Sequence, residues 1–104
     1  MPKFIFAYHG GKSPESPEEG EKVMAAWNAW YGSLGNAVLD GGGPCGPSNT
    51  VSTSGVAEDG GANPLSGLTQ VEAADMDTAL EMAKGCPMVV DGSGSVEVAE
   101  VLQM

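Results

Sequence analysis

His9 and Asp40 are the two side chains in this chain best suited to acid–base chemistry. His9 is the single histidine, so it alone has an unperturbed pKa near neutrality. Each residue lies near the end of an expected strand, and Asp40 precedes three glycines. If both side chains point into one cleft, His9 acts as a general base oriented by Asp40. Hydrogen bonds would come from Tyr8, Asn49 or Ser52. The alternative is structural: a strand-end histidine bonded to a loop carbonyl, and an acid that forms a turn.

Trp27 and Trp30 are the candidate aromatic residues for contact with a ligand. They recur with Val23, Tyr31 and Leu34 at helical spacing, which predicts one apolar stripe along a helix. Both tryptophans should therefore face the core or a cavity beside it. Two interpretations stay open at this point. They are core residues of an amphipathic helix, or they form the wall of a pocket for a small apolar or planar ligand.

The sequence favours neither a metal nor a cofactor. Cys45 and Cys86 lie far apart and match no short metal-ligand spacing, so both are expected to be free thiols. Cys86, between a helix stop and Pro87, suits a buried position, and Cys45 lies in a Gly/Pro turn. One histidine with scattered carboxylates gives no ligand set. The glycine-rich segments contain no Walker lysine and no GxGxxG between a strand and a helix.

The charge balance excludes several classes of partner. The 104 residues include fourteen acids against four basic residues, all of them lysine, and the formal net charge is −10. Such a surface repels nucleic-acid backbones and anionic membranes. No apolar run is long enough to span a bilayer, and the N-terminus has no signal-peptide pattern. We therefore expect a cytoplasmic protein that binds neither nucleic acid nor membrane.

The helices and strands that must position these side chains are predicted from hydrophobic periodicity and from helix-capping and turn residues. In the first strand Phe4, Phe6 and Tyr8 point to one face, while Ile5, Ala7 and His9 point to the other. The sequence predicts strands over residues 3–9, 37–40, 49–54, 67–73 and 95–101, with helices from the Ser16 cap to Gly35 and over 75–84.

This order predicts one domain over residues 1–104, of α+β class with a ferredoxin-like βαββαβ plan. Two helices would cover one face of an antiparallel sheet, and the segment 49–54 would be an added edge or hairpin. The other face would stay open, and an open face needs a cover. Pairing of two sheets would give a dimeric α/β barrel, so we expect a homodimer.

The final third of the chain resembles the YCII-related (DGPF-domain) proteins. The resemblance rests on residues 67–79, Gly85-Cys86-Pro87 and residues 94–98, with support from the opening strand and Val23-Met24-Ala25-Ala26. It implies a ferredoxin-like domain that dimerises into a barrel with a cleft between sheet and helices. It also implies lyase-type chemistry on cyclic compounds in a few relatives, where a His–Asp pair is a suggested dyad.

The chain departs from the family pattern at the proposed dyad. Trp27 stands where many members have a histidine, and Cys86 stands where some have an aspartate. The DGPF signature survives only as Asp59-Gly60. The sequence thus leaves three hypotheses. The first is a dimeric small-molecule-binding domain with an aromatic cleft, the second is a lyase or isomerase that uses His9, and the third is a protein-interaction module.

Overall fold

The computed structural model describes residues 1–103. Its main sheet contains β1 (Lys3–Gly10), β2 (Val38–Pro44), β5 (Leu65–Glu72) and β6 (Gly94–Val101). The helices are α1 (Pro17–Leu34), α2 (Met76–Lys84) and the short α3 (Pro87–Val90), and the 3-10 turn η1 (Gly35–Ala37) follows α1. A separate two-stranded sheet consists of β3 (Thr50–Ser52) and β4 (Gly55–Ala57).

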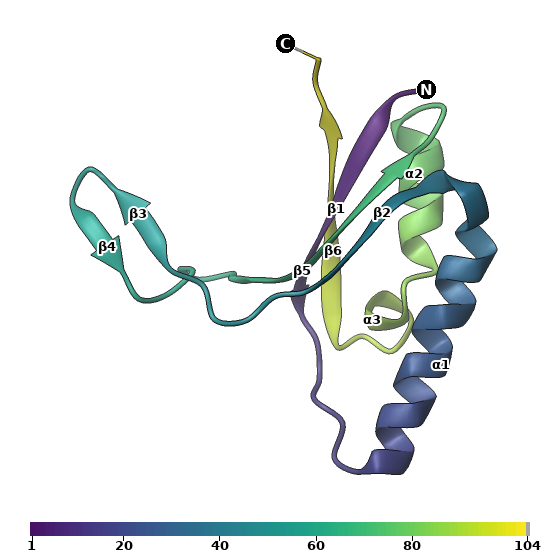
Figure 1. Ribbon diagram of the computed structural model, residues 1–104, viewed down its shortest axis with the longest axis horizontal. Helices are drawn as coiled ribbons and strands as arrows, with labels where there is room; N and C mark the ends of the chain where they lie inside the picture. Colours follow the sequence, from purple (N-terminus) through teal and green to yellow (C-terminus); the bar gives the residue numbers. More distant parts are fainter. Residues whose placement is uncertain (104) are drawn as a thin grey trace.

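The main sheet joins two interleaved strand–helix–strand units. Its strands are hydrogen-bonded in the order β2-β5-β1-β6, and each neighbouring pair is antiparallel. Each unit therefore holds one strand of the other unit between its own two strands. Both α1 and α2 lie on the same side of the sheet (Figure 1). The result is a small α+β fold that is consistent with the expected ferredoxin-like plan.

Local caps explain where the two long helices begin and end. Ser16 accepts a hydrogen bond from the Glu19 amide at 3.1 Å, and Pro17 occupies the first turn, as predicted. The Glu19 carboxylate reaches back to the Glu15 amide rather than to the cap residue itself. Gly35, with a φ of 57°, ends α1. Asp75 caps α2 by accepting from the Thr78 amide at 2.8 Å.

Three elements differ from the sequence-based expectation. The strand expected over 37–40 continues to Pro44, and its register with β5 shifts on both sides of Asp40. The segment over 49–54, expected as an added edge or hairpin, belongs to the β3–β4 hairpin, but its strand covers only residues 50–52. After Gly85 the chain forms α3 instead of passing directly into β6. Glycines have low strand propensity, so only pairing with β5 could extend β2 through Gly41–Gly43.

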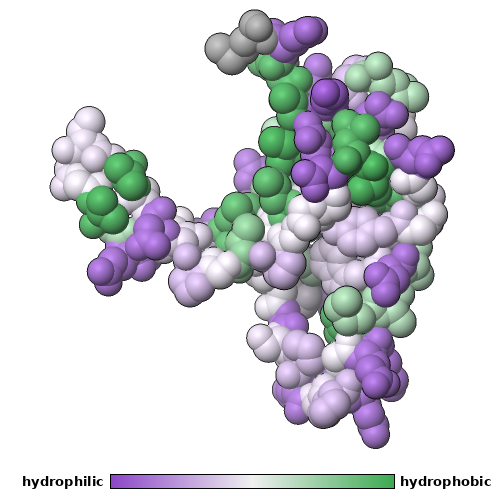
Figure 2. All heavy atoms as spheres, viewed as in Figure 1, coloured by the Kyte–Doolittle hydropathy of each residue, from purple (hydrophilic) through white to green (hydrophobic). Residues whose placement is uncertain are grey.

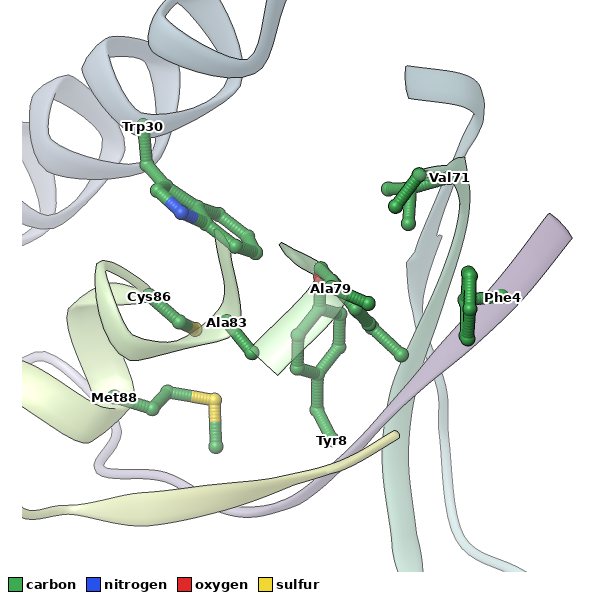
Figure 3. Close-up of a cluster of buried hydrophobic side chains, with 10 residues drawn as sticks. Phe4, Tyr8, Trp30, Val71, Ala79, Ala83, Cys86 and Met88 are labelled. Atoms are coloured by element: carbon green, nitrogen blue, oxygen red, sulfur yellow. The ribbon is translucent and has the colours of Figure 1, made fainter. Parts of the chain in front are cut away.

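The core lies between the sheet and the helices. Phe4, Phe6 and Tyr8 alternate along β1 toward this side and are at most 4% exposed. Trp30 extends from α1 toward Tyr8 and the alanines of α2 (Figure 3). Its ring stacks on Phe6 with centroids 6.1 Å apart, and its indole N–H donates to the Met82 carbonyl at 3.0 Å. Burial of these aromatic side chains holds α1 against the sheet.

The opposite face of the sheet has no helix over it (Figure 1). Residues directly paired across antiparallel strands share a face. Ile5 and Ala7 therefore share this face with Leu68, which is paired with Ala7, and with Ala99, which is paired with Ile5. Leu68 is 39% exposed. This surface, defined by Ile5, Ala7, Leu68, Ala99 and Val101, is called the open sheet face below.

Residues 45–64 form an arm that projects from the body. The arm joins the end of β2 to the start of β5 and ends in the β3–β4 hairpin (Figure 1). It makes the molecule less compact than a simple domain. The radius of gyration is 14.8 Å, against about 13 Å for a compact domain of ~100 residues.

The remaining structural expectations concern thiols and membrane spans. Cys86 is buried and both thiols are free, as predicted, and Cys45 is exposed. Burial raises the pKa of the Cys86 thiol, which keeps it protonated and unreactive. Within residues 1–103, no helix combines the length and apolar character needed to cross a membrane.

Candidate functional site: a cleft between α1 and the sheet

A cleft of about 400 Å³ lies between α1 and the end of the sheet from which the arm departs. This volume falls within the usual range for small-molecule sites. Aromatic, small and apolar residues predominate in the lining. The lining residues are Tyr8, Val23, Met24, Trp27, Asn28, Tyr31, Gly41, Gly42, Gly43, Pro44, Ser66, Gly67 and Met88.

Helical and strand periodicity together build the aromatic wall of the cleft. Trp27 and Tyr31 are four residues apart on α1, so their side chains lie on one face of the helix. Tyr8 reaches the same space from β1 because it alternates toward the helices. Trp27 meets Tyr8 edge to face, with ring centroids 5.2 Å apart, and lies 6.0 Å from Tyr31. These rings offer both a face and an edge to a planar ligand.

Three hydroxyl groups meet at the base of this wall. Tyr8 donates to Thr69 Oγ1 at 2.7 Å, and Thr69 Oγ1 donates to the Gly41 carbonyl at 3.2 Å. Tyr31 Oη lies 3.0 Å from the same Thr69 oxygen. Thr69 is fully buried, and Tyr31 Oη also lies 3.4 Å from the Gly41 carbonyl, so the Tyr31 proton has an acceptor in either Thr69 or Gly41. Both phenol oxygens then keep acceptor capacity for a ligand.

Burial determines the protonation state of Tyr8. Desolvation is the largest influence and raises the pKa of Tyr8 far above its usual range, although the bond to Thr69 acts in the opposite direction. Tyr8 therefore stays a neutral phenol at physiological pH. A neutral phenol can orient a polar ligand, but it is a poor general base.

The glycine-rich segment 41–43 forms the opposing wall. Gly42 has a φ of 59°, and a Cβ at this position would collide with the carbonyl oxygen of Leu68. Only glycine permits this close approach of β2 to β5. Asp40 shapes the same turn, because its carboxylate accepts from the Gly42 amide at 2.8 Å. The backbone of this wall can thus lie directly beside a ligand.

His9 belongs to a different environment. Its side chain lies on the face opposite Tyr8, where Nε2 is 2.9 Å from Glu97 Oε1 and Nδ1 is 3.2 Å from the Pro64 carbonyl. The hydrogen bond to Glu97 is the largest influence and raises the pKa of His9. His9 is 9% exposed. It links β1 to β6 and to the final residues of the arm.

The register does not bring His9 and Asp40 together. β5 lies between their strands, and His9 pairs with Leu65 while Asp40 pairs with Gln70. Strand spacing and rise then place the two backbones about 10 Å apart across the sheet and about 16 Å apart along it. Each side chain is bonded to a nearer partner, as in the structural alternative for both residues. The partner of His9 is Glu97, which sequence reasoning had not singled out.

The other candidates divide between core, cleft and arm. Tyr8 and Trp27 line the cleft, whereas Trp30 is 6% exposed and packs in the core behind them. Asn49 and Ser52 lie on the exposed arm, where the Ser52 hydroxyl is bonded to that of Ser54 at 2.8 Å. These two residues are not among those that line the cleft.

Sequence reasoning did not identify Tyr31, Thr69 and the glycine wall as parts of a site. The spacing of Tyr31 and Trp27 was an available signal, since residues four apart on a helix share a face. Thr69 is the one hydroxyl residue within an otherwise apolar inward-facing series of β5, and that position was a second signal. Within residues 1–103, no cluster of histidine, cysteine and carboxylate side chains is arranged to hold a metal ion.

A comparison with solved structures finds a similar fold in an enzyme. The chain matches 5-chloro-2-hydroxyhydroquinone dehydrochlorinase (TftG) from Burkholderia phenoliruptrix AC1100, in a complex with 2,5-dihydroxybenzoquinone. The TM-score is 0.58 at 17% sequence identity, and the match covers 96% of this chain and 95% of that one. No family model and no curated protein matches the sequence. At this identity the likeness establishes a shared small α+β fold.

Proposed function

We propose that this protein binds a small planar ring compound with hydroxyl substituents in the cleft between α1 and the sheet. The observation that carries the proposal is the meeting of an aromatic wall with a hydroxyl cluster in one cavity. Trp27, Tyr31 and Tyr8 supply ring contacts, and the two tyrosines also supply polar atoms. Aromatic walls with a few fixed polar groups are typical of small-molecule sites.

The hydrogen-bond directions specify the ligand further. Tyr8 donates its proton to Thr69, and the Tyr31 proton has acceptors within the protein in Thr69 and the Gly41 carbonyl. The phenol oxygens therefore act as acceptors toward the cavity. A ligand with O–H groups, such as a dihydroxybenzene, complements them better than a ring that has only carbonyl oxygens. The fold neighbour, whose bound molecule is a dihydroxylated ring, supports the same class of compound.

Binding is favoured over catalysis by the chemistry of the lining. The described residues around the cleft include no carboxylate, histidine or lysine, and Tyr8 is held neutral. A lyase or isomerase needs a group that removes a proton. The alternative function, an enzyme of this kind with His9 as base, would require the substrate on the opposite face of the sheet, where Glu97 rather than Asp40 is the partner of His9. The observation that supports this alternative is the dehydrochlorinase activity of the fold neighbour.

We further propose that the protein is a homodimer of the YCII-related type, in which two open sheet faces meet in an α/β barrel. The exposed apolar residues of that face, such as Leu68 and Val101, support this assembly, and the register places the polar side chains of Gln70 and Glu97 among them. A protein-interaction module would instead use the same face for a different chain.

The binding proposal is tested by calorimetry with hydroquinone as the probe and toluene as the matched ring without oxygen. We expect hydroquinone to bind more tightly than toluene. Tyr31→Phe should weaken hydroquinone binding about three- to tenfold, the worth of one neutral hydrogen bond, and should leave toluene unchanged. Trp27→Leu should weaken both.

Asn49→Ala provides the control, because Asn49 lies on the arm outside the cleft. It should bind hydroquinone like the wild type. Equal affinity for the two probes, or loss of binding in Asn49→Ala alone, would overturn the proposal. Conversion of hydroquinones or their chlorinated forms that stops in His9→Gln would instead support the enzyme alternative.

A further inference from the structure

The β3–β4 hairpin at the end of the arm has one apolar side. Val51 is paired directly with Val56, so both side chains lie on the same face of the hairpin. They are 78% and 67% exposed. Figure 2 shows this apolar pair as a separate patch at the end of the arm, away from the apolar surface of the body. Such a patch at the tip of a projecting element is suited to contact with another molecule.

The hairpin is too short to contribute much stability by itself. Each of its strands has three residues, and a hairpin of this kind is at best marginally stable in water. The side-chain bonds near the hairpin are local to the arm: Thr50 donates to the Asp59 carbonyl, and the Ser52 and Ser54 hydroxyls bond to each other. None of these contacts covers the valines.

The direction of the arm indicates which surface could contact the two valines. The arm extends on the side of the sheet away from α1 and α2, which is the side of the open sheet face (Figure 1). A second copy seated on the open sheet face would therefore lie beside the arm. In a two-fold arrangement each copy offers the same surfaces, so both arms would be used equally.

We propose that, in the homodimer, each arm extends over the second copy and packs Val51 and Val56 against it. This inference rests on the dimer proposed above. One copy thereby covers both unpartnered apolar surfaces of the other, the open sheet face and the valine pair. Each copy has a formal charge of −10, so two copies repel each other. Contact through the arms adds buried area to the dimer, which helps to offset this repulsion.

The arm also connects the interface to the cleft. Pro44 and Ser66, which flank the arm where it joins β2 and β5, line the cleft, and the Cys45 amide donates to the Ser66 carbonyl at 2.9 Å. His9 holds the other end through the Pro64 carbonyl. An arm fixed on a second copy would fix this wall of the cleft. Dimer dissociation should therefore weaken ligand binding.

Sedimentation equilibrium of the double variant Val51→Thr/Val56→Thr tests the arm contact. Threonine keeps the β-branched shape that favours the hairpin but places a hydroxyl where the valine methyl was. We expect the dimer dissociation constant to rise at least about tenfold. Val90→Thr is the matched control, because Val90 is 74% exposed on α3, on the helix side of the sheet. It should dimerise like the wild type.

The outcomes separate the arm contact from the dimer and from the binding function. A wild-type dimer that the double variant leaves unchanged overturns the arm contact while the dimer stands. A wild-type monomer, or an arm that engages only a different protein, overturns both. Amide exchange gives a second measurement: residues 50–57 should exchange more slowly in concentrated than in dilute protein, and equal rates contradict the arm contact. Hydroquinone binding by the monomer would leave the proposed function intact.

Discussion

At the residue scale, Thr69 organises the polar part of the cleft. It is fully buried, and its hydroxyl joins two tyrosines from different elements to the Gly41 carbonyl. A valine of the same shape would leave the Tyr8 proton without its acceptor and would leave Tyr31 with only the Gly41 carbonyl at 3.4 Å. An unsatisfied buried polar group costs more than an average hydrogen bond contributes. Thr69 is thus important for stability and for the orientation of the cleft hydroxyls.

Thr69→Val should lower the free energy of unfolding by about 1–3 kcal/mol. Urea denaturation of the variant and the wild type measures the change. Thr53→Val, at an exposed position of the arm, is the control and should unfold like the wild type. A Thr69→Val protein as stable as the wild type would show that the three hydroxyls do not act as a connected cluster.

A second residue-scale prediction concerns pH and the His9–Glu97 pair. The hydrogen bond to Glu97 raises the pKa of His9 above its unfolded value near 6.5. The charged pair therefore stabilises the fold most fully below that unfolded pKa, and its contribution is lost as pH rises through the folded pKa. Glu97→Gln should be destabilised relative to wild type at pH 5.5 and much less so at pH 8.5. Urea denaturation at both values tests this, and an equal difference at both would contradict it.

At the element scale, α1 positions the aromatic wall, and its first turn depends on the Ser16 cap. Ser16→Ala should cost about 1 kcal/mol in the free energy of unfolding, because the Glu19 amide loses its acceptor. Ser13→Ala, in the loop before the helix, is the matched control. Thermal denaturation of the two variants compares them directly. Equal midpoints would mean that the cap does not limit the stability of α1.

The elements also show how far sequence could predict this structure. Helix ends were predictable, because caps such as Ser16, Gly35 and Asp75 act through neighbouring residues. The extension of β2 through Gly41–Gly43 was not, because it depends on pairing with β5. The candidate site was recovered only in part. Strand alternation already separates Tyr8 from His9, whereas the meeting of Tyr8, Thr69 and Tyr31 depends on how three elements pack together.

At the scale of the whole molecule, charge and shape act in opposite directions on assembly. The open sheet face and the arm would favour the proposed dimer, whereas a formal charge of −10 on each copy opposes it. Salt screens this repulsion over distances of about 8 Å at physiological ionic strength. The dissociation constant of the proposed dimer should therefore depend on salt, and the direction of the change distinguishes apolar contacts from ion pairs.

Raising sodium chloride from about 0.05 M to about 0.5 M should tighten the proposed dimer, because apolar contacts persist while the repulsion weakens. Sedimentation equilibrium across this range measures the dissociation constant. Val51→Thr/Val56→Thr should show the same direction of salt dependence from a weaker starting point. A dimer that dissociates as salt rises would instead be held by ion pairs and would contradict the apolar interface.

The central claim is that the cleft between α1 and the sheet holds a hydroxylated planar ring. The most direct measurement is a crystal structure of the protein grown with hydroquinone. The account predicts the ring beside Trp27, with its hydroxyl groups within hydrogen-bond distance of Tyr8 and Tyr31. A ring bound against His9 on the opposite face of the sheet, or an empty cleft at saturating hydroquinone, would contradict it.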